Sequence, residues 1–325
     1  MISIKNDKEI EYMREAGIIA YDLLMSLKDV IKPGISTKKI DDYCRKFIED
    51  RKAIPAFLGY DGFPATACIS VNDMIVHGIP SNTTILKDGD IVTVDTGAIV
   101  NGYYSDTAYT YIVGKVDKKT EDFVNNTRKA LYEGISVVKE GIKLNEVCKA
   151  IERVARENGY GIFDFLTGHG VGTDMHEDPY VPNLSNHESE GIILKAGMTL
   201  AIEPMFSLGT SDAWLMPDNW GIVTQDGSVT AHFEHTILVT KDGYEILTGE
   251  WKMAKEKDGY IELEGKVLEV IPGGDFKVQL DNGHIVVARV SGKMRLNMIR
   301  IYPGDTVLME VPICDLTHGR IIYRK

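Results

Sequence analysis

Apolar residues in the first part of the chain recur at helical spacing. Between residues 10 and 31 they fall every three or four positions, which places them on one helix face. Asn6 or Asp7 can cap the start of this helix. After the turn sequence "PGIS", a second helix is predicted with an apolar face over residues 40–48.

The same pattern then returns further along the chain. Residues 119–140 and 143–158 are predicted to be helices separated by a turn at "EGI". A shift of 107 residues superposes the two patterns, pairing Leu24 with Leu131, Gly34-Ile35 with Gly141-Ile142, and Ile40 with Val147. Strand-like runs follow the first helix pair: "TACISVN", "DIVTVDTGAIV" and "YYSDTAYTYIVG". These features predict one α+β domain of two related halves, whose strands share a sheet covered by helices.

A different pattern starts near Glu250. The stretch "EGKVLEVIPGGDFKVQLDNGHIVVARVSGK" alternates apolar and polar residues and contains turn signals at "PGG" and "DNG". "DTVLMEVPI" and "GRIIYRK" add strands. This part is predicted to be a small closed or half-open β-barrel.

The charge is divided at the same place. Residues 253–325 hold 11 Lys and Arg against 10 Asp and Glu, whereas the preceding 252 residues hold 25 against 38. An acidic first part is not a general nucleic-acid binder. The N-terminus lacks an apolar signal-peptide core, and no apolar run approaches the roughly 18 residues that span a bilayer. The four cysteines, Cys44, Cys68, Cys148 and Cys314, include no close pair, which fits a reducing cytoplasm.

Two acids flank a strong hairpin signal. If Asn101-Gly102 is a two-residue loop, Val100 pairs with Tyr103 and Asp95 pairs with Ala108. Asp106 then points to the same face as Asp95, as a diagonal neighbour. Two carboxylates that converge in this way repel each other unless a cation lies between them.

Further candidate ligands lie in apolar surroundings. Glu203 lies in "MTLAIEPMF" and Glu234 lies in "TAHFEHTILV". Burying their charges among apolar residues costs free energy unless each carboxylate is paired or bound to a metal. Together with His169 they complete an oxygen-rich set suited to Mn²⁺, Fe²⁺ or Co²⁺, with Zn²⁺ as an alternative. Two ions would account for so many carboxylates. Taken one at a time, such residues are more often solvated acids or a satisfied core histidine.

The stretch "TGHGVGTDMHEDP" holds His169 and His176 among three glycines. Seven residues apart, the two rings would stack on one face of a helix, but the glycines and Pro179 make a helix unfavourable.

Several motifs, in this order and spacing, resemble the bacterial type I methionine aminopeptidases: "VDTGAIVNGYYSDTAYTYIVG", "GHGVG…MHEDP", "GMTLAIEP" and "FEHT". The resemblance covers residues 1 to about 250. It implies the pita-bread fold, in which two pseudo-symmetric halves share a central antiparallel sheet. It also implies a dinuclear centre of Co, Mn, Fe(II) or Zn, with Asp106 and Glu234 bridging the ions and the five ligands being Asp95, Asp106, His169, Glu203 and Glu234.

The same resemblance implies the remaining parts of an active site. His77 and His176 would lie near the scissile bond, and Glu203 would also pass a proton to the leaving amine after attack by a metal-bridged hydroxide. The methionine side chain would lie among Tyr60, Phe63, Cys68 and Trp220. Substrates would be nascent polypeptide N-termini with a small second residue. Phe57 and Met175 depart from the residues common in the family, Cys and Phe.

Two rival interpretations use related folds. A proline-handling peptidase such as prolidase has similar ligands but carries a substantial domain before this one. A metal-free pita-bread binding protein loses ligands, whereas all five are present here.

Residues 253–325 closely resemble bacterial translation initiation factor one. This implies an OB-fold that binds the small ribosomal subunit and its rRNA through Lys293, Arg295, Arg300, Arg320, Arg324 and Lys325. Each of these side chains alone is more often a solvated charge. The expected domains are therefore residues 1–250 and 253–325, joined by an exposed linker at 248–259 in a monomeric cytoplasmic protein. The sequence leaves open whether the fusion is natural or engineered.

Overall fold

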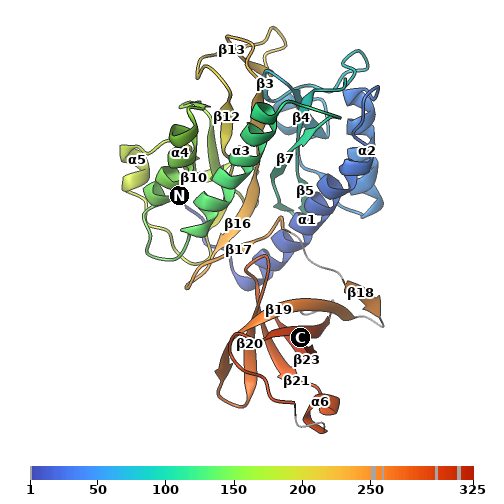
Figure 1. Ribbon diagram of the computed structural model, residues 1–325, viewed down its shortest axis with the longest axis vertical. Helices are drawn as coiled ribbons and strands as arrows, with labels where there is room; N and C mark the ends of the chain where they lie inside the picture. The colour runs from blue at the N-terminus through green and yellow to red at the C-terminus, as the bar shows by residue number, and fades with distance from the viewer. Residues whose placement is uncertain (1, 250–253, 258–259, 297–298, 313–315) are drawn as a thin grey trace. The chain divides into compact units, whose positions relative to one another are not determined.

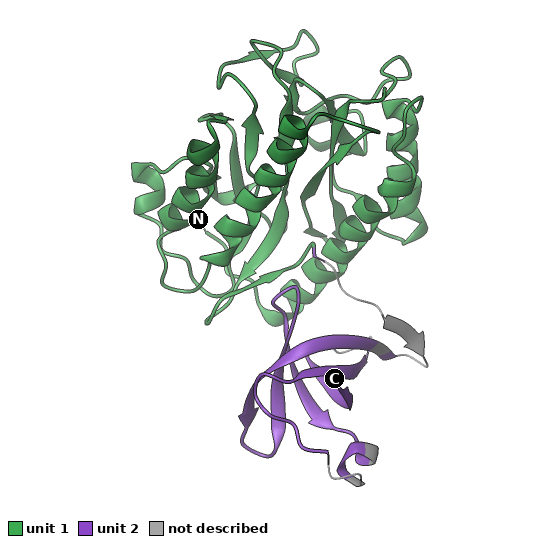
Figure 2. Ribbon diagram, viewed as in Figure 1, with its two compact units in different colours: residues 1–248 green, residues 249–325 purple. Residues whose placement is uncertain are grey.

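The computed structural model describes residues 2–249, 254–257, 260–296, 299–312 and 316–325. The chain divides into two compact units, Met1–Thr248 and Gly249–Lys325 (Figure 2). Within the described ranges, no helix combines the length and the apolar character needed to cross a membrane.

Four long helices of the first unit form the two predicted pairs (Figure 1). The first pair is α1 (Asp7–Ser26) and α2 (Thr37–Asp50), and the second is α3 (Lys118–Ser136) and α4 (Leu144–Asn158). The start of α4 lies 107 residues after the start of α2, which is the shift of the sequence repeat.

The end of α3 differs from the prediction. The helix stops at Ser136 rather than near residue 140. The backbone amides of Glu140 and Gly141 donate instead to Thr240 O (3.1 Å) and Leu194 O (2.9 Å), outside the helix. These bonds tie the turn to Thr240, directly after β16, and to Leu194, contacts that propensity along one segment cannot reveal.

Asn6 is the residue that caps α1. Its side chain accepts the backbone amides of Lys8 and Glu9, both at 3.1 Å. The Glu9 carboxylate accepts the Asn6 amide at 2.8 Å and so completes a capping box. The cap satisfies amides that the first turn leaves without intrahelical partners.

Each half contributes an antiparallel sheet. The first half has the order β2-β4-β7, and the second has β10-β9-β11-β16-β17. α1 and α2 bury their apolar faces against β2, β4 and β7, while α3 and α4 pack against β11 and β16. The bounds are β2 Ala67–Val71, β4 Ile91–Thr96, β7 Thr107–Ile112, β9 Thr167–Gly170, β10 Glu177–Pro182, β11 Thr199–Ile202, β16 His235–Val239 and β17 Tyr244–Ile246.

Shorter elements complete the unit. The strands are β1 Ile54–Pro55, β3 Met74–Val76, β5 Ala98–Val100, β6 Tyr103–Tyr104, β8 Gly161–Ile162, β12 Met205–Ser207, β13 Ala213–Leu215, β14 Ile222–Thr224 and β15 Thr230–His232. The short helices are η1 Leu27–Asp29, η2 Tyr60–Gly62 and α5 His187–Glu190.

The hairpin around Asn101-Gly102 has the predicted register. Val100 pairs with Tyr103 across the turn, and further along Asp95 pairs with Ala108. Both turn residues have positive φ, 50° and 84°, as the tight turn requires. The turn sequence therefore sets which residues of β4 and β7 face each other.

Threonine hydroxyls join the two half-sheets along a seam between the start of β7, with the preceding Asp106, and the segment that runs from the end of β15 into β16. Thr236 Oγ1 donates to Asp106 O at 2.7 Å and accepts the Asp106 amide at 3.0 Å. Thr107 Oγ1 donates to Glu234 O at 2.8 Å, and the Glu234 amide donates to Ala108 O at 3.0 Å. The backbones of two predicted metal ligands, one from each half, are fixed by this seam.

The second unit is a closed barrel of five strands. The order β19-β20-β21-β23-β22 closes because β22 also pairs with β19, and the β21–β23 pair is parallel. This closed β-barrel agrees with the predicted OB-fold. The bounds are β18 Ala254–Lys257, β19 Tyr260–Ile271, β20 Asp275–Leu280, β21 Ile285–Val290, α6 Gly292–Leu296, β22 Thr306–Pro312 and β23 His318–Arg324.

The expected linker at 248–259 is partly structured. Residues 254–257 form β18, which pairs antiparallel with the start of β19. Residues 250–253 and 258–259 lie outside the described residues.

Candidate metal centre

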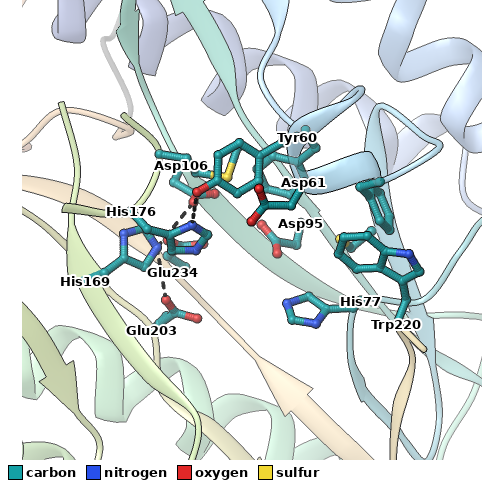
Figure 3. A pocket seen from close by; sticks show the side chains of 14 residues that line it. Tyr60, Asp61, His77, Asp95, Asp106, His169, His176, Glu203, Trp220 and Glu234 are labelled. Carbon is teal, nitrogen blue, oxygen red and sulfur yellow. Dashed lines mark hydrogen bonds and ion pairs between the residues drawn. The ribbon is translucent and has the colours of Figure 1, made fainter. Parts of the chain in front are cut away.

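All the site residues predicted for the first unit line one cavity of about 240 Å³ (Figure 3). They are the five predicted ligands, the two predicted helper histidines and the four predicted pocket residues: Asp95, Asp106, His169, Glu203, Glu234, His77, His176, Tyr60, Phe63, Cys68 and Trp220. Phe57, Asp61 and Met175 complete the lining.

The five predicted ligands lie on strands or at strand ends. Asp95 is in β4 and His169 is in β9, while Asp106 directly precedes β7. Glu203 lies in the break between β11 and β12, and Glu234 lies in the break between β15 and β16. Rigid strands therefore hold each side chain near its neighbours.

Asp106, His169 and Glu234 form the tightest group. Their potential ligand atoms all lie within 4.8 Å of one another. Nε2 of His169 lies 3.6 Å from Oδ2 of Asp106 and 3.6 Å from Oε1 of Glu203. Nδ1 of His169 is 2.8 Å from Gly170 O, so Nδ1 donates to that carbonyl and Nε2 faces the carboxylates.

Three of the carboxylates each have one oxygen without a hydrogen-bond partner among the described residues. Asp95 Oδ1, Asp106 Oδ1 and Glu234 Oε1 are buried and have no hydrogen bond among the described residues. Burial, together with the charge of neighbouring Asp106, raises the pKa of both Asp95 and Glu234 well above their usual range. Such a cluster fits divalent cations, because they neutralise converging carboxylates and accept oxygen ligands.

His169 responds to the same negative field. Burial alone would lower its pKa, but the neighbouring carboxylates of Asp106 and Glu203 raise the pKa to about 9. The carboxylates stabilise the protonated form of His169. A metal ion would compete with that proton for Nε2.

His176 lies against His169, with ring centroids 4.2 Å apart. Burial and the positive charge of His169 lower the pKa of His176 to about 4. Burial also lowers the pKa of His77, whose ring meets Trp220 edge-on at 6.3 Å. Both helper histidines are therefore neutral near pH 7.

An apolar wall faces these polar groups. Phe63 and Trp220 meet edge-to-face with centroids 5.1 Å apart. Cys68, directly opposite Asp95 in the β2–β4 ladder, is buried with Phe57 and Met175. Burial raises the pKa of the Cys68 thiol well above its usual range, so it stays protonated. The wall can accept an apolar, thioether-containing side chain.

Three residues near the site were not predicted from sequence: Asp61, Asn183 and His232. Asp61 lines the cavity with φ 47° between Gly59 and Gly62. His232 contacts Glu203, and Asn183 donates to the Glu203 carbonyl. His232 could have been found, because in "TAHFEHT" it precedes Glu234 by two residues, the period of one strand face.

Several of the predicted RNA-binding residues of the second unit are engaged in ion pairs within the unit. Arg295 and Arg300 line a cavity of about 760 Å³ with Arg289 and Tyr302. Arg324 forms an ion pair with Asp305 at 2.9 Å. Arg320 pairs with Glu310, and Lys325 pairs with Glu264. The side chain of Lys293 lies outside the described residues.

Comparisons with known proteins agree with this geometry. Residues 11–241 match metallopeptidase family M24, and residues 249–325 match the translation initiation factor 1A / IF-1 family. Methionine aminopeptidase 1 of Bacillus subtilis is 44% identical over 248 residues, covering 76% of this chain and 99% of that protein. The crystal structure of methionine aminopeptidase from Thermotoga maritima superposes with a TM-score of 0.75 at 42% identity, covering 77% of this chain and all of that one.

Prolidase from Pyrococcus furiosus is similar at a greater distance. Its TM-score is 0.62 at 25% identity, and the match covers 77% of this chain but 66% of the prolidase chain. The likeness to prolidase supports the pita-bread architecture. The higher sequence identities to the two methionine aminopeptidases favour that group over the prolidases. The chain thus belongs to metallopeptidase family M24, within the methionine aminopeptidases, and carries an IF-1 family domain at its C-terminal end.

Proposed function

We propose that the first unit removes N-terminal methionine from polypeptides whose second residue is small. One observation carries the proposal: five potential ligands, two neutral imidazoles and an apolar wall line the same cavity. The ligands can hold metal, the imidazoles can assist at a carbonyl, and the wall can hold a methionine side chain. The methionine aminopeptidase relatives supply the substrate class.

Two divalent ions are proposed as the cofactors, and the cavity residues Asp95, Asp106, His169, Glu203 and Glu234 would hold them. Co, Mn, Fe(II) and Zn all suit the donor set. Such ions supply a nucleophile at neutral pH and polarise the scissile carbonyl.

The side chains around the ions have separate proposed roles. His176, neutral at pH 7, donates a hydrogen bond to the oxygen that becomes negative during attack. Glu203 carries a proton to the leaving amine. His77, on the side of Trp220, contacts the substrate near the scissile bond.

The decisive experiment compares substrates and metals in the full chain. After exhaustive chelation, Mn²⁺, Fe²⁺, Co²⁺ or Zn²⁺ is added back and release of Met from Met-Ala-Ser is measured beside hydrolysis of an Xaa-Pro dipeptide. We expect metal-dependent Met release and no dipeptide cleavage. Turnover that survives with no metal detected would overturn the metal role, and preferential Xaa-Pro cleavage would favour a prolidase.

Substitutions test the individual roles. Glu203→Ala and His176→Ala should each reduce turnover by at least about 10²-fold, the usual scale for proton transfer or oxyanion stabilisation. Near-normal turnover in either variant would show that its residue has another role.

We further propose that residues 253–325 bind the small ribosomal subunit through rRNA in the cytoplasm. The cavity lined by Arg295, Arg300 and Tyr302 combines cations with an aromatic ring, the chemistry that suits single-stranded nucleic acid. Arg289 lines it too, but its guanidinium is paired with Asp275 at 2.7 Å. Binding of the full chain to ribosomal RNA should weaken steeply with salt. Salt-independent binding would argue against phosphate contacts, and sedimentation would test the proposed monomer.

A further inference from the structure

The carboxylate of Glu203 lies between two imidazoles, and the proposed function uses one of them. Nε2 of His169 lies 3.6 Å from Oε1 of Glu203. Nε2 of His232 lies 3.4 Å from Oε2. Each carboxylate oxygen therefore faces a different histidine.

His232 lies beside Glu203 but does not line the cavity. Its side chain is 2% exposed. Its Nε2 has no hydrogen bond to any described residue. Because a buried polar atom without a partner is costly, the nearest carboxylate oxygen is the partner this nitrogen can gain by a small adjustment.

The backbone of His232 is firmly held. His232 pairs with Met205 in the β15–β12 ladder, two residues after Glu203. Thr110 Oγ1 donates to His232 O at 2.7 Å and accepts the His232 amide at 2.9 Å. Thr93 Oγ1 lies 2.8 Å from the same hydroxyl, and since Thr110 has already used its one proton, Thr93 is the donor.

The backbone of Glu203 is also fixed, but its carboxylate is not. Asn183 Nδ2 donates to Glu203 O at 3.0 Å. Among the described residues, none forms a hydrogen bond with the Glu203 carboxylate that would fix its orientation. The imidazoles of His169 and His232 lie on its two sides instead. The orientation of this carboxylate therefore depends on what those rings donate.

We propose that His232 is a positioning residue for Glu203. Its Nε2–H donates to Oε2 and holds the carboxylate so that Oε1 faces the metal-binding cavity. A hydrogen bond to a charged acceptor is short and strong, and partners of this kind orient ligating carboxylates in metal sites. The inference rests on the metal site of the proposed function.

Four variants of the full chain test this role. His232→Gln keeps an amide N–H that can reach Oε2, His232→Asn places its amide too far back, and His232→Leu removes the donor. His235→Gln is the matched control, since His235 is a neighbouring buried histidine whose nitrogens face Tyr132 and Thr248 at 3.2 and 3.1 Å. Thermal melts establish that each variant is folded.

The readouts are Mn²⁺ affinity and stoichiometry by calorimetry, and kcat and KM on Met-Ala-Ser. We expect His232→Asn and His232→Leu to lose about 10- to 100-fold in Mn²⁺ affinity or in kcat, the usual effect of removing such a partner, with KM little changed. His232→Gln should recover most of the loss, and His235→Gln should keep the wild-type affinity. The Asn variant keeps the test valid if the Leu variant does not fold.

Two results would overturn the proposal. Wild-type affinity and kcat in both the Asn and Leu variants would show that Glu203 needs no partner. Loss of one bound ion that His232→Gln does not restore would show that the imidazole is itself a ligand. If the wild type binds Mn²⁺ with this dependence on residue 232 but releases no Met, the proposed function fails and the positioning role stands.

Discussion

The phenol oxygen of Tyr60 lies 2.8 Å from Nδ1 of His176. Burial and the charge of Asp61 raise the pKa of Tyr60, so the phenol keeps its proton. With His176 neutral, the phenol can donate to Nδ1, which places the imidazole proton on Nε2. That tautomer is the one that can donate to a developing oxyanion.

Removing this hydrogen bond should slow the reaction without emptying the metal site. Tyr60→Phe should lower kcat by about fivefold, since one hydrogen bond contributes about 1 kcal/mol. Steady-state kinetics on Met-Ala-Ser and calorimetry with Mn²⁺ measure the two effects. Tyr43→Phe is the control, because it removes a phenol bond to Ser26 elsewhere in the unit. Unchanged kcat in Tyr60→Phe would mean that His176 needs no fixed tautomer.

The metal-free protein should respond to pH in a characteristic way. The pKa of Glu234 is raised in the folded state, so the unfolded chain loses this proton first as pH rises. The contribution of Glu234 to the free energy of unfolding of the metal-free protein therefore falls as pH rises above about 4, the usual pKa of a glutamate.

Comparison with Glu234→Gln isolates this effect from other titrating groups. In chelator, the variant should gain stability relative to the wild type between pH 5 and pH 8, as followed by urea unfolding. Added Mn²⁺ should stabilise the wild type and reverse the order. A difference that does not vary with pH would show that Glu234 titrates normally.

Gly17 should resist replacement although it lies inside a helix. Alanine there would favour α1 by propensity. However, a Cβ at Gly17 would lie 2.3 Å from the backbone oxygen of Leu247, a residue whose amide donates to Thr236 O in β16 at 2.9 Å. Gly17→Ala should thus destabilise the unit by about 1–3 kcal/mol, the usual cost of overpacking. Gly243→Ala, which has nothing within 4 Å of its Cβ, is the control in chemical denaturation.

Cleavage at the joint should separate two working modules. In the sequence, the boundary between the two compact units falls between Thr248 and Gly249. Brief proteolysis should cut between residues 248 and 259 and leave an N-terminal fragment with full aminopeptidase activity. Mass spectrometry locates the cut. Resistance at the joint, or an N-terminal fragment without activity, would mean that the modules depend on each other.

Much of the fold follows from local sequence signals. Asn101-Gly102 dictates a tight turn, and the turn dictates that Asp95 faces Ala108. The helix pairs follow from apolar spacing and from caps such as Asn6. The sequence alone therefore predicts which residues pair across a hairpin.

Contacts between distant segments were harder to predict. The basic residues of the second unit illustrate this. Arg320 forms an ion pair with Glu310 because the register of β22 and β23 places the two residues opposite each other. No turn signal sets that register from ten residues away, and the ion pair reduces the free charge expected of Arg320. The sequence spacing relates His232 to Glu234, but its contact with Glu203, between β11 and β12, depends on how distant segments pack.

The seam of threonine hydroxyls has a consequence for how the protein unfolds. Asp95 and Asp106 come from the first half, whereas His169, Glu203 and Glu234 come from the second. An ion shared by Asp106 and Glu234 would act as a cross-link between the halves, closing a chain loop of more than a hundred residues as a disulfide would. Metal loss would then loosen the whole unit, and metal supply would set the lifetime of the enzyme as well as its rate.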